Sequence, residues 1–179
     1  MLKDPTLSIG KSSLQQVVWR LWNGSDPNIT GGTMILNPDY KEFFQLLNAN
    51  DVRYLIIGGY AVAYHGYPRY TKDIDIWIWV NPENAGRLVR ALREFGFESL
   101  GLEVDDFLEP DTIIQLGYAP NRIDLIMGAP GVDFNQCYQA RIEDEIDGVK
   151  LVFIDLEGLK KSKKASGRLQ DLADIDNLK

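Results

Sequence analysis

Hydrophobic positions recur along this chain with two different periods, and each change of period predicts a boundary between elements. In the first part, apolar residues at helical spacing follow Ser12 and stop at Asn23-Gly24, which predicts one amphipathic helix. The turn-forming segment 25–32 then predicts a flexible join. We therefore expect an N-terminal helical arm over residues 1–36 and a separate domain over residues 37–179.

The domain itself alternates between helical patterns and short apolar runs. Asparagine followed by proline starts a helical pattern twice, at Asn37 and at Asn81, because asparagine caps a helix and proline suits its first turn. Runs rich in Ile, Val and Trp are typical of strands. The expected helices cover 38–50, 61–64, 82–95 and a tail from about 155 that is interrupted near Gly167, and the expected strands cover 52–57, 73–80, 112–118, 122–127 and 149–154. This order predicts an α/β (α+β) fold with a mixed central sheet, flanking helices and a helical C-terminal tail.

Two aspartates open the most apolar of the predicted strands. Asp73 and Asp75 are two residues apart, so a strand places both side chains on one face, where the two anions repel each other. Asp124 lies between apolar residues of another predicted strand, and Asp111 is the next candidate for a third acid. Oxygen ligands at one sheet edge are what Mg²⁺ prefers, so these carboxylates predict a metal site. The alternative is that strand-end aspartates are only solvated or cap a turn.

A glycine pair precedes these acids. Gly58-Gly59 follows the apolar run 52–57, where glycine lets the backbone approach another group closely. Amide N–H groups at the start of the short helix that follows favour an anion such as a triphosphate. Taken alone, the pair is equally consistent with an ordinary turn between a strand and a helix.

The order and spacing of these features resemble a known family. The segment GGYAVAYHGYPRYTKDIDIWI, residues 58–78, resembles the signature of the polymerase-β-like nucleotidyltransferase superfamily: a glycine pair after a first strand, a short helix, Asp-x-Asp opening the next strand, and a third acid on a later strand, where Asp124 stands. The run Arg69-Tyr-Thr71-Lys-Asp73-Ile-Asp75 and the tail from Lys163 to Asp174 are similar to the bacterial minimal and AbiEii-like branch, often toxins of toxin–antitoxin pairs. The resemblance covers about 37–179. Gly59 departs from it, because many relatives have a serine there.

The resemblance implies Mg²⁺-dependent transfer of an NMP from an NTP, ATP or another, to an acceptor hydroxyl. Two Mg²⁺ ions, or Mn²⁺ in their place, would be held by Asp73 and Asp75, with Asp124 completing the site that activates the acceptor. The residues implied in nucleotide binding are Gly58, Gly59, Arg69, Thr71, Lys72 and Lys163. For the lysines and the arginine, the alternative is a solvated surface side chain.

Other conspicuous residues have simpler interpretations. His65 is the single histidine and stands before Gly66, which suits the end of a short helix as well as a place in the site. Trp77 and Trp79 share the face of the acids but lie farther along the strand, which favours core packing. The single cysteine, Cys137, is expected to be buried and inert.

Charge and composition restrict the class of protein. The 19 Lys and Arg against 26 Asp and Glu leave a net charge of -7, which argues against binding nucleic acid by bulk phosphate neutralisation, so an RNA partner would have to meet a local patch such as the lysine-rich segment 160–164. One cysteine allows no intrachain disulfide, and no apolar run approaches the roughly 20 residues needed to cross a bilayer. We expect a soluble cytoplasmic protein with no membrane partner.

Three functions remain open at this stage. The first is a toxin–antitoxin type enzyme that modifies RNA or protein and has a cognate antitoxin protein as partner. The second is a transferase of the same chemistry that acts on a small molecule such as an aminoglycoside-like antibiotic. The third is a non-catalytic module that binds a nucleotide or a partner, against which stands the presence of Asp73, Asp75 and Asp124 together.

Overall fold

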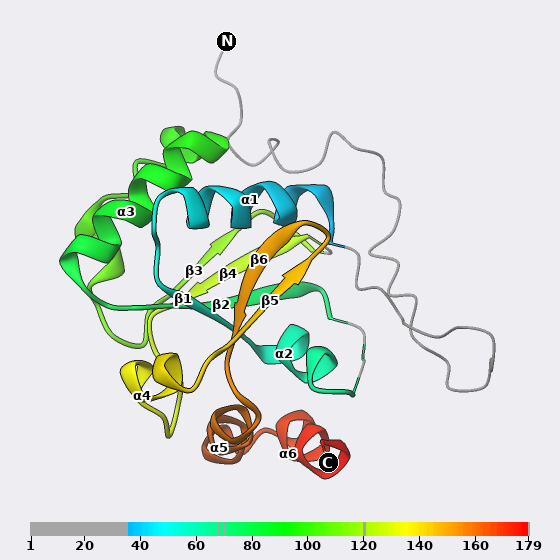
Figure 1. Ribbon diagram of the computed structural model, residues 1–179. Coiled ribbons are helices and arrows are strands. Elements are labelled where there is room, and N and C mark those ends of the chain that lie inside the picture. The colour runs from blue at the N-terminus through cyan, green and yellow to red at the C-terminus, as the bar shows by residue number, and fades with distance from the viewer. Residues whose placement is uncertain (1–35, 68, 70, 120, 179) are drawn as a thin grey trace.

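The computed structural model describes residues 36–67, 69, 71–119 and 121–178 and shows an α/β fold built on one mixed sheet (Figure 1). The helix predicted in the N-terminal arm lies outside the described residues. Six strands form the sheet in the order β3-β4-β2-β1-β6-β5. They are β1 (Tyr54–Ile57), β2 (Asp73–Ile78), β3 (Ile113–Leu116), β4 (Arg122–Ile126), β5 (Ile142–Ile146) and β6 (Val149–Phe153), and the α-helices are α1 (Pro38–Ala49), α2 (Gly58–Tyr64), α3 (Pro82–Leu92), α4 (Phe134–Gln139), α5 (Leu156–Ser166) and α6 (Leu169–Asn177).

Strand directions decide which ends meet. β1 runs antiparallel to β2 and parallel to β6, while β2 runs parallel to β4. The C-terminal ends of β1 and β6 therefore lie at the same sheet edge as the N-terminal ends of β2 and β4. The two outermost strands, β3 and β5, are each antiparallel to their neighbour. As a result, three parts of the chain meet at the same end of the strands: the segment 58–59 after β1, the aspartates of β2 and β4, and the start of the helical tail.

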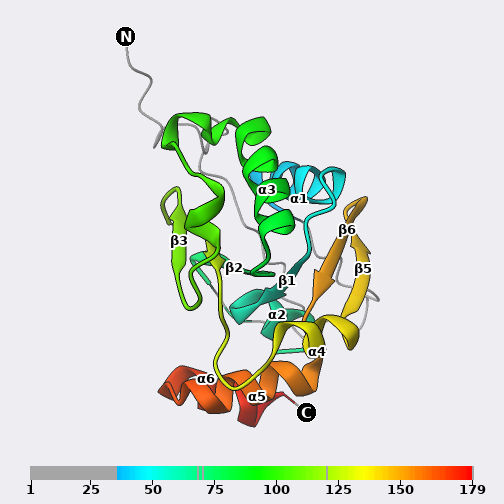
Figure 2. The same ribbon diagram turned by 90° about the vertical axis from the view of Figure 1, so that its left-hand side faces the viewer.

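The helices cover the two faces of the sheet in separate groups. Helices α1 and α3 lie on one side, and α5 and α6 lie on the other, with α2 between the sheet and the tail (Figures 1 and 2). On the α1 side, the buried Tyr54 pairs with Ile78, and the Tyr54 ring lies 5.4 Å from that of Phe44. On the other side, the buried Trp77 makes an edge contact with Phe134 at 5.1 Å. Trp77 thus packs in the core, as predicted.

Most predicted boundaries are confirmed within a few residues. The side chain of Asn37 accepts a hydrogen bond from the Asp39 amide, and that of Asn81 accepts from the amides of Glu83 and Asn84, so both asparagines cap their helices. Gly167 has a φ of 66° and ends α5, as expected for a glycine after a helix. Cys137 is buried in α4, as predicted, and its lack of reactivity stays a prediction.

Three features differ from the prediction. Strand β5 was not expected, because its central residues 143–145 are all acidic and exposed and show no alternation of apolar and polar positions. The short helix α4 was also missed. The helix expected to reach Phe95 ends at Leu92 and continues as a π-helical turn, Arg93–Phe97, in which Gly96 has a φ of 105°. Among the described residues, no helix is long and apolar enough to cross a membrane.

Candidate functional site

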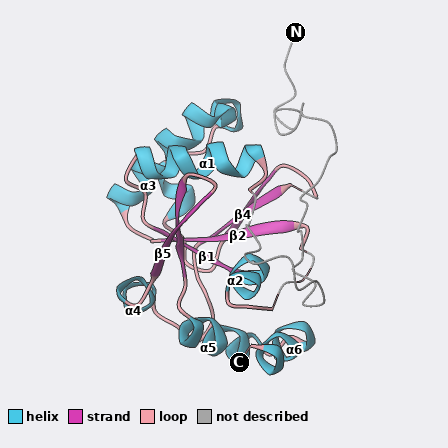
Figure 3. Ribbon diagram, turned by 45° about the vertical axis from the view of Figure 1, so that its right-hand side comes forward, coloured by secondary structure: helices cyan, strands magenta, loops and turns pink. Residues whose placement is uncertain are grey.

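The register of the sheet brings the three predicted acids together. Asp75 is the direct partner of Asp124 across β2 and β4, and Asp73 is the partner of Arg122. Because residues two apart share a face, Asp73, Asp75, Arg122 and Asp124 all lie on the same face of the sheet. Asp75 lies against Gly58, the first residue of α2, and Figure 3 shows α2, α5 and α6 on one side of these strands and α1 and α3 on the other. We call these four residues the strand-acid cluster.

Arg122 connects two of the three carboxylates. Its Nε donates to Asp124 Oδ1 at 2.7 Å, and its Nη2 donates to Asp124 Oδ2 at 2.9 Å and to Asp73 Oδ2 at 2.6 Å. Asp73 Oδ1 also accepts from the Thr71 hydroxyl at 2.8 Å, and Asp124 accepts a weaker bond from Gln115 at 3.2 Å. These donors give Asp73 and Asp124 a positively charged partner within the protein.

Asp75 lacks such a partner. Within the described residues, no hydrogen bond or ion pair reaches its carboxylate. The pKa of Asp75 is raised to about 6, mainly by burial and also by the negative charges of Asp73 and Asp124, while the charges of Lys163 and Arg122 oppose this rise. Three carboxylates and one guanidinium leave the strand-acid cluster with excess negative charge at neutral pH.

The glycine pair lies directly against Asp75. Gly58 has a φ of +64°, and a Cβ added there would overlap Asp75 Oδ2, so a side chain at this position would force Asp75 to move. A Cβ at Gly59 would stand 3.0 Å from the Cβ of Thr71. Gly59 is already in the first turn of α2, which begins three residues earlier than the helix predicted from Ala61. The close approach of backbone to acid is therefore real, whereas a phosphate contact at this turn stays a prediction.

A second cluster joins the helical tail to the segment before β2. The Lys163 ammonium lies 2.7 Å from both Asp171 Oδ1 and Asp174 Oδ2, and Arg69 Nε lies 2.9 Å from Asp174 Oδ1. Asp174 is completely buried, which opposes its ionisation, but the hydrogen bonds from Lys163, Arg69 and Gln170 outweigh this and lower its pKa. We call Arg69, Lys163, Asp171 and Asp174 the tail cluster. Its Lys163 is the member whose charge lowers the pKa of Asp75, so it links the two clusters.

The remaining predicted residues have different places. Lys72 is exposed beside the acids. His65 is the C-cap of α2, and its Nε2 lies 2.8 Å from the carbonyl oxygen of Ile154, which supports the helix-end interpretation. Asp111 lies at the far end of β4, since a Cβ at Gly128 would meet its Oδ1 at 2.3 Å, so Asp111 does not belong to the site.

Sequence reasoning missed Arg122 and the two acids of the tail cluster. Arg122 stands two residues before Asp124, and the same parity rule that places Asp73 beside Asp75 would have placed it on the face of the acids. Asp171 and Asp174 are three residues apart on a helix, so they share one side of α6. Their partner Arg69 is 105 positions away from Asp174, and no spacing rule reveals such a pair.

The three aspartates are chemically suitable ligands for a divalent cation, but their side chains are only partly arranged to hold one. Mg²⁺ prefers carboxylate oxygens, and the strand-acid cluster offers three carboxylates with excess negative charge around the unpaired Asp75. In the part of the chain that the structure describes, however, no three His, Cys, Asp or Glu side chains stand in place to hold a metal ion together. Asp73 and Asp124 are instead held by Arg122.

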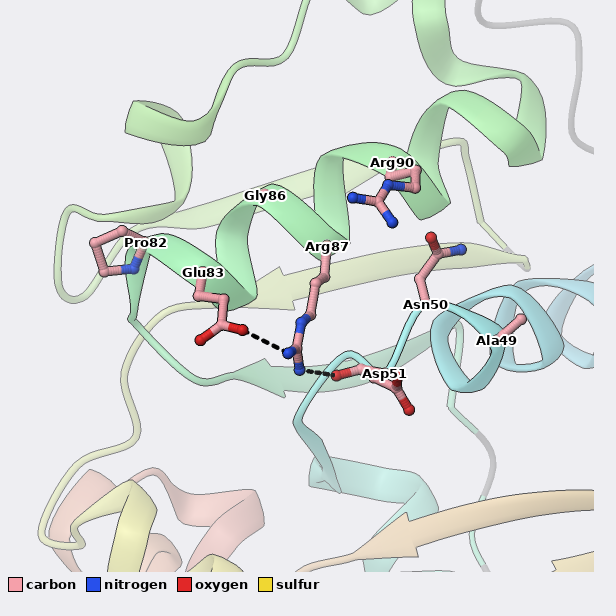
Figure 4. A pocket seen from close by; sticks show the side chains of 8 residues that line it. All are labelled: Ala49, Asn50, Asp51, Pro82, Glu83, Gly86, Arg87 and Arg90. Carbon is pink, nitrogen blue, oxygen red and sulfur yellow. Dashed lines mark hydrogen bonds and ion pairs between the residues drawn. The ribbon is translucent and has the colours of Figure 1, made fainter.

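A separate cavity of about 450 Å³ lies between the C-terminal end of α1 and α3 (Figure 4). Arg87 donates there to the carbonyl oxygen of Asp51 and to Glu83, and Arg90 also lines the cavity. The helices that form it lie across the sheet from the tail, and none of the predicted site residues lines it. The cavity therefore adds nothing to the chemistry of the acids.

Solved structures described as nucleotidyltransferases superpose on this chain to different extents. A proposed nucleotidyltransferase from Thermotoga maritima superposes with a TM-score of 0.53 at 17% sequence identity, over 80% of this chain and 94% of that one. For an antigenic nucleotidyltransferase-like protein from Paracoccidioides brasiliensis, the TM-score is 0.49 at 22% identity, over 78% and 73% of the two chains. For the lincosamide antibiotic adenylyltransferase LnuA with lincomycin bound, it is 0.44 at 14% identity, over 80% and 96%.

No protein-family model matches the sequence, and no curated protein matches it either. The likeness to the Thermotoga maritima structure shows the fold: this chain has the mixed-sheet nucleotidyltransferase fold predicted from its sequence. The closer relation to the AbiEii-like branch stays a prediction.

Proposed function

We propose that this chain, which has a nucleotidyltransferase fold, transfers an NMP from an NTP to an acceptor hydroxyl. The observation that carries the proposal is the gathering of Asp73, Asp75 and Asp124 on one face, at the edge where the Gly58 turn closes against Asp75. Excess negative charge in a half-buried site costs stability unless a cation or a positively charged ligand joins it. A purely structural role does not explain why the chain retains this charge.

Asp73 and Asp75 are the residues we propose as ligands of a divalent cation, with Asp124 joining them for a second one. When bound, Mg²⁺ would neutralise phosphate oxygens and lower the pKa of the acceptor hydroxyl. In the reaction, the acceptor oxygen forms a bond to the α-phosphorus, the bond from that phosphorus to the bridging oxygen breaks, and pyrophosphate leaves. Asp124 accepts the proton of the acceptor hydroxyl.

The remaining residues position the nucleotide. We assign the backbone amides of Gly58 and Gly59 and the exposed Lys72 to the phosphates. Thr71 donates to Asp73 and orients it, and Arg69 and Lys163 act through the tail cluster, which places a positive charge near Asp75. A triphosphate can draw Lys163 away from Asp171, because both partners offer anionic oxygens to the same ammonium.

For the acceptor, we propose RNA, in the manner of a toxin–antitoxin enzyme with an antitoxin protein as its partner. Lys161, Lys164 and Arg168 are exposed on the tail next to the tail cluster, and such a local positive patch can meet phosphates although the whole chain is acidic. Modification of a protein or of an antibiotic-like small molecule is the other outcome of the test below.

The test incubates the purified protein with each of the four α-labelled NTPs, Mg²⁺ and a cell extract that contains RNA, protein and metabolites. We expect one NTP to transfer label to RNA, and Asp75→Asn to lower this transfer by about a hundredfold to a thousandfold, the scale of losing one catalytic electrostatic contact. Asp176→Asn, on the exposed side of α6, is the matched control and should transfer normally. Absence of labelled product with every NTP, or unchanged transfer in Asp75→Asn, would contradict the proposed function.

A further inference from the structure

Arg122 occupies a central place in the strand-acid cluster that the proposed reaction leaves unexplained. Its guanidinium donates two hydrogen bonds to Asp124, one from Nε and one from Nη2, and Nη2 also donates to Asp73. Among the described residues, Arg122 is the one cation that forms ion pairs with these acids. It therefore stands as the counter-ion of the site in the absence of any other cation.

The backbone makes this position unavoidable. Arg122 is the β4 partner of Asp73, and Asp124 is the partner of Asp75, so the parallel register sets the arginine next to both acids on one face. The guanidinium fork then matches a carboxylate in bidentate geometry. The Arg122 side chain is nevertheless 29% exposed, against 8% for Asp124, so it can turn towards solvent while the acids keep their places.

We propose that Arg122 is a built-in counter-ion that competes with a divalent cation for Asp73 and Asp124. This inference rests on the proposed function, because it takes the strand-acid cluster as the place where divalent cations bind. Although the register makes the three acids neighbours, no three acidic, His or Cys side chains among the described residues are placed to hold a metal together. The carboxylates of Asp73 and Asp124 bond to the guanidinium instead.

The competition has a direction. No described residue forms a hydrogen bond or ion pair with Asp75, so a first cation held by Asp75 and Asp73 displaces at most the single bond from Arg122 to Asp73. A second cation needs Asp124, and it must replace two charge-assisted hydrogen bonds from the fork. Arg122 thus stabilises the protein without metal and weakens the uptake of the second ion. Once released, the guanidinium carries its charge to the solvent side, where phosphate oxygens would arrive.

The test measures Mn²⁺ binding to the metal-free protein without any NTP, by the electron paramagnetic resonance signal of free Mn²⁺. We expect Arg122→Gln to bind the second Mn²⁺ about tenfold or more tighter than the parent, because the competing charge is gone. Arg122→Lys keeps the charge but loses the fork, so its affinity should lie between the two. Arg87→Gln is the matched control, because Arg87 is similarly exposed at 34% and is also bonded to a carboxylate, that of Glu83, but lies outside the site. Its Mn²⁺ binding should equal that of the parent.

Thermal unfolding supplies a second readout. In EDTA, Arg122→Gln should melt below the parent because the three carboxylates then repel one another, and saturating Mn²⁺ should raise its melting temperature by more degrees than it raises that of the parent. If Arg122→Gln does not fold without metal, the same two measurements on Arg122→Lys decide the question. Equal or weaker Mn²⁺ binding in the arginine variants would overturn the inference and leave the proposed function standing. Absence of Mn²⁺ binding in every variant, the parent included, would overturn the inference and the metal-dependent function together.

Discussion

The strand-acid cluster and the tail cluster both contain partly or fully buried carboxylates, but positive and negative charges balance only in the tail cluster. In the tail cluster, Asp171 and Asp174 face Lys163 and Arg69, so two acids meet two cations. In the strand-acid cluster, three acids share Arg122. The pKa of Asp174 lies below its ordinary value although the residue is completely buried, whereas burial raises that of Asp75 to about 6.

Burial alone therefore does not decide the charge state of a carboxylate. Both residues are desolvated, but Asp174 accepts hydrogen bonds from charged donors, and no described residue donates one to Asp75. A balanced cluster can serve as a structural joint, here between the tail and the segment before β2. The strand-acid cluster carries more negative than positive charge, so it favours binding of a further cation. Four predictions about single substitutions test this difference between the clusters, and the one with the largest expected effect comes first.

Removing the charge of Asp174 should break the joint. Asp174→Asn leaves Lys163 and Arg69 without their shared carboxylate in a buried place, and we expect a loss of about 3 to 5 kcal/mol in the free energy of unfolding. Denaturation in urea at pH 7, followed by tryptophan fluorescence, measures it. The control Asp176→Asn changes an exposed acid of the same helix and should leave stability unchanged within error. Equal stability of both variants would show that the tail cluster holds nothing together.

Removing the charge of Asp75 should increase the free energy of unfolding, whereas removing that of Asp174 should decrease it. The folded-state pKa of Asp75 is raised from 3.8 to about 6, so its contribution to stability is present below about pH 4 and is lost as pH rises through 6. Asp75→Asn has no proton to lose, and in EDTA at pH 7.5 we expect it to be about 2 to 3 kcal/mol more stable than the parent.

The pH profile distinguishes this cause from a general packing effect. The advantage of Asp75→Asn should shrink towards zero as pH falls below about 4, where both proteins are uncharged at this position. Urea denaturation at intervals from pH 3.5 to 8 measures it. Added Mg²⁺ should also reduce the advantage, because the cation stabilises only the parent. A constant difference at every pH would show that charge is not the reason.

How much of this was readable from the sequence depends on the range of each interaction. Local rules predict two features: the helix caps at Asn37 and Asn81, and the common face of Asp73 and Asp75. The meeting of Asp75 with Asp124 depends on the register of β2 and β4, and a slip by one residue would turn Asp124 to the other face. The apolar surroundings of Asp124 therefore predicted only that it could lie beside the other two acids, and the resemblance added that its position is that of the third acid.

The tail cluster shows the limit of local rules more clearly. Lys163 was predicted to reach the triphosphate, yet its partners depend on the angle between α5 and α6 and on a contact with Arg69 from another part of the chain. Strand β5 escaped prediction for a different reason: as an exposed edge strand it buries only its first and last residues in part or in full, so it carries no alternating pattern.

A methyl group at Gly58 should disturb the strand-acid cluster from the backbone side. Gly58→Ala introduces a Cβ that meets Asp75 Oδ2 at 1.8 Å in a left-handed conformation. Gly101→Ala is matched to it, because Gly101 has almost the same φ, +63° against +64°, and a Cβ there meets no atom within 4 Å. We expect Gly58→Ala to lose about 1 to 2 kcal/mol more than Gly101→Ala in urea denaturation, since only the first forces Asp75 to move. Equal losses would mean that the left-handed backbone is the whole cost.

The smallest effect that we expect compares one hydroxyl donor in each cluster. Thr71 donates to Asp73 Oδ1 at 2.8 Å, and Ser166 donates to Asp171 Oδ2 at 2.7 Å, so Thr71→Val and Ser166→Ala each remove one short hydrogen bond to a carboxylate. Asp171 keeps its bond from the Lys163 ammonium, and Asp174, which shares that ammonium, also has Arg69. Among the described residues, Asp73 and Asp124 have only the Arg122 guanidinium as a charged donor between them. The loss of a donor should therefore cost more in the strand-acid cluster, by about 1 kcal/mol within the usual range for hydrogen bonds to charged groups. Urea denaturation of the two variants at pH 7.5 in EDTA measures the difference between their losses in stability. With Mg²⁺ added, this difference should become smaller, because the cation then stabilises the Asp73 carboxylate in place of the Thr71 hydroxyl. A larger loss for Ser166→Ala would reverse the assignment of which cluster is short of positive charge.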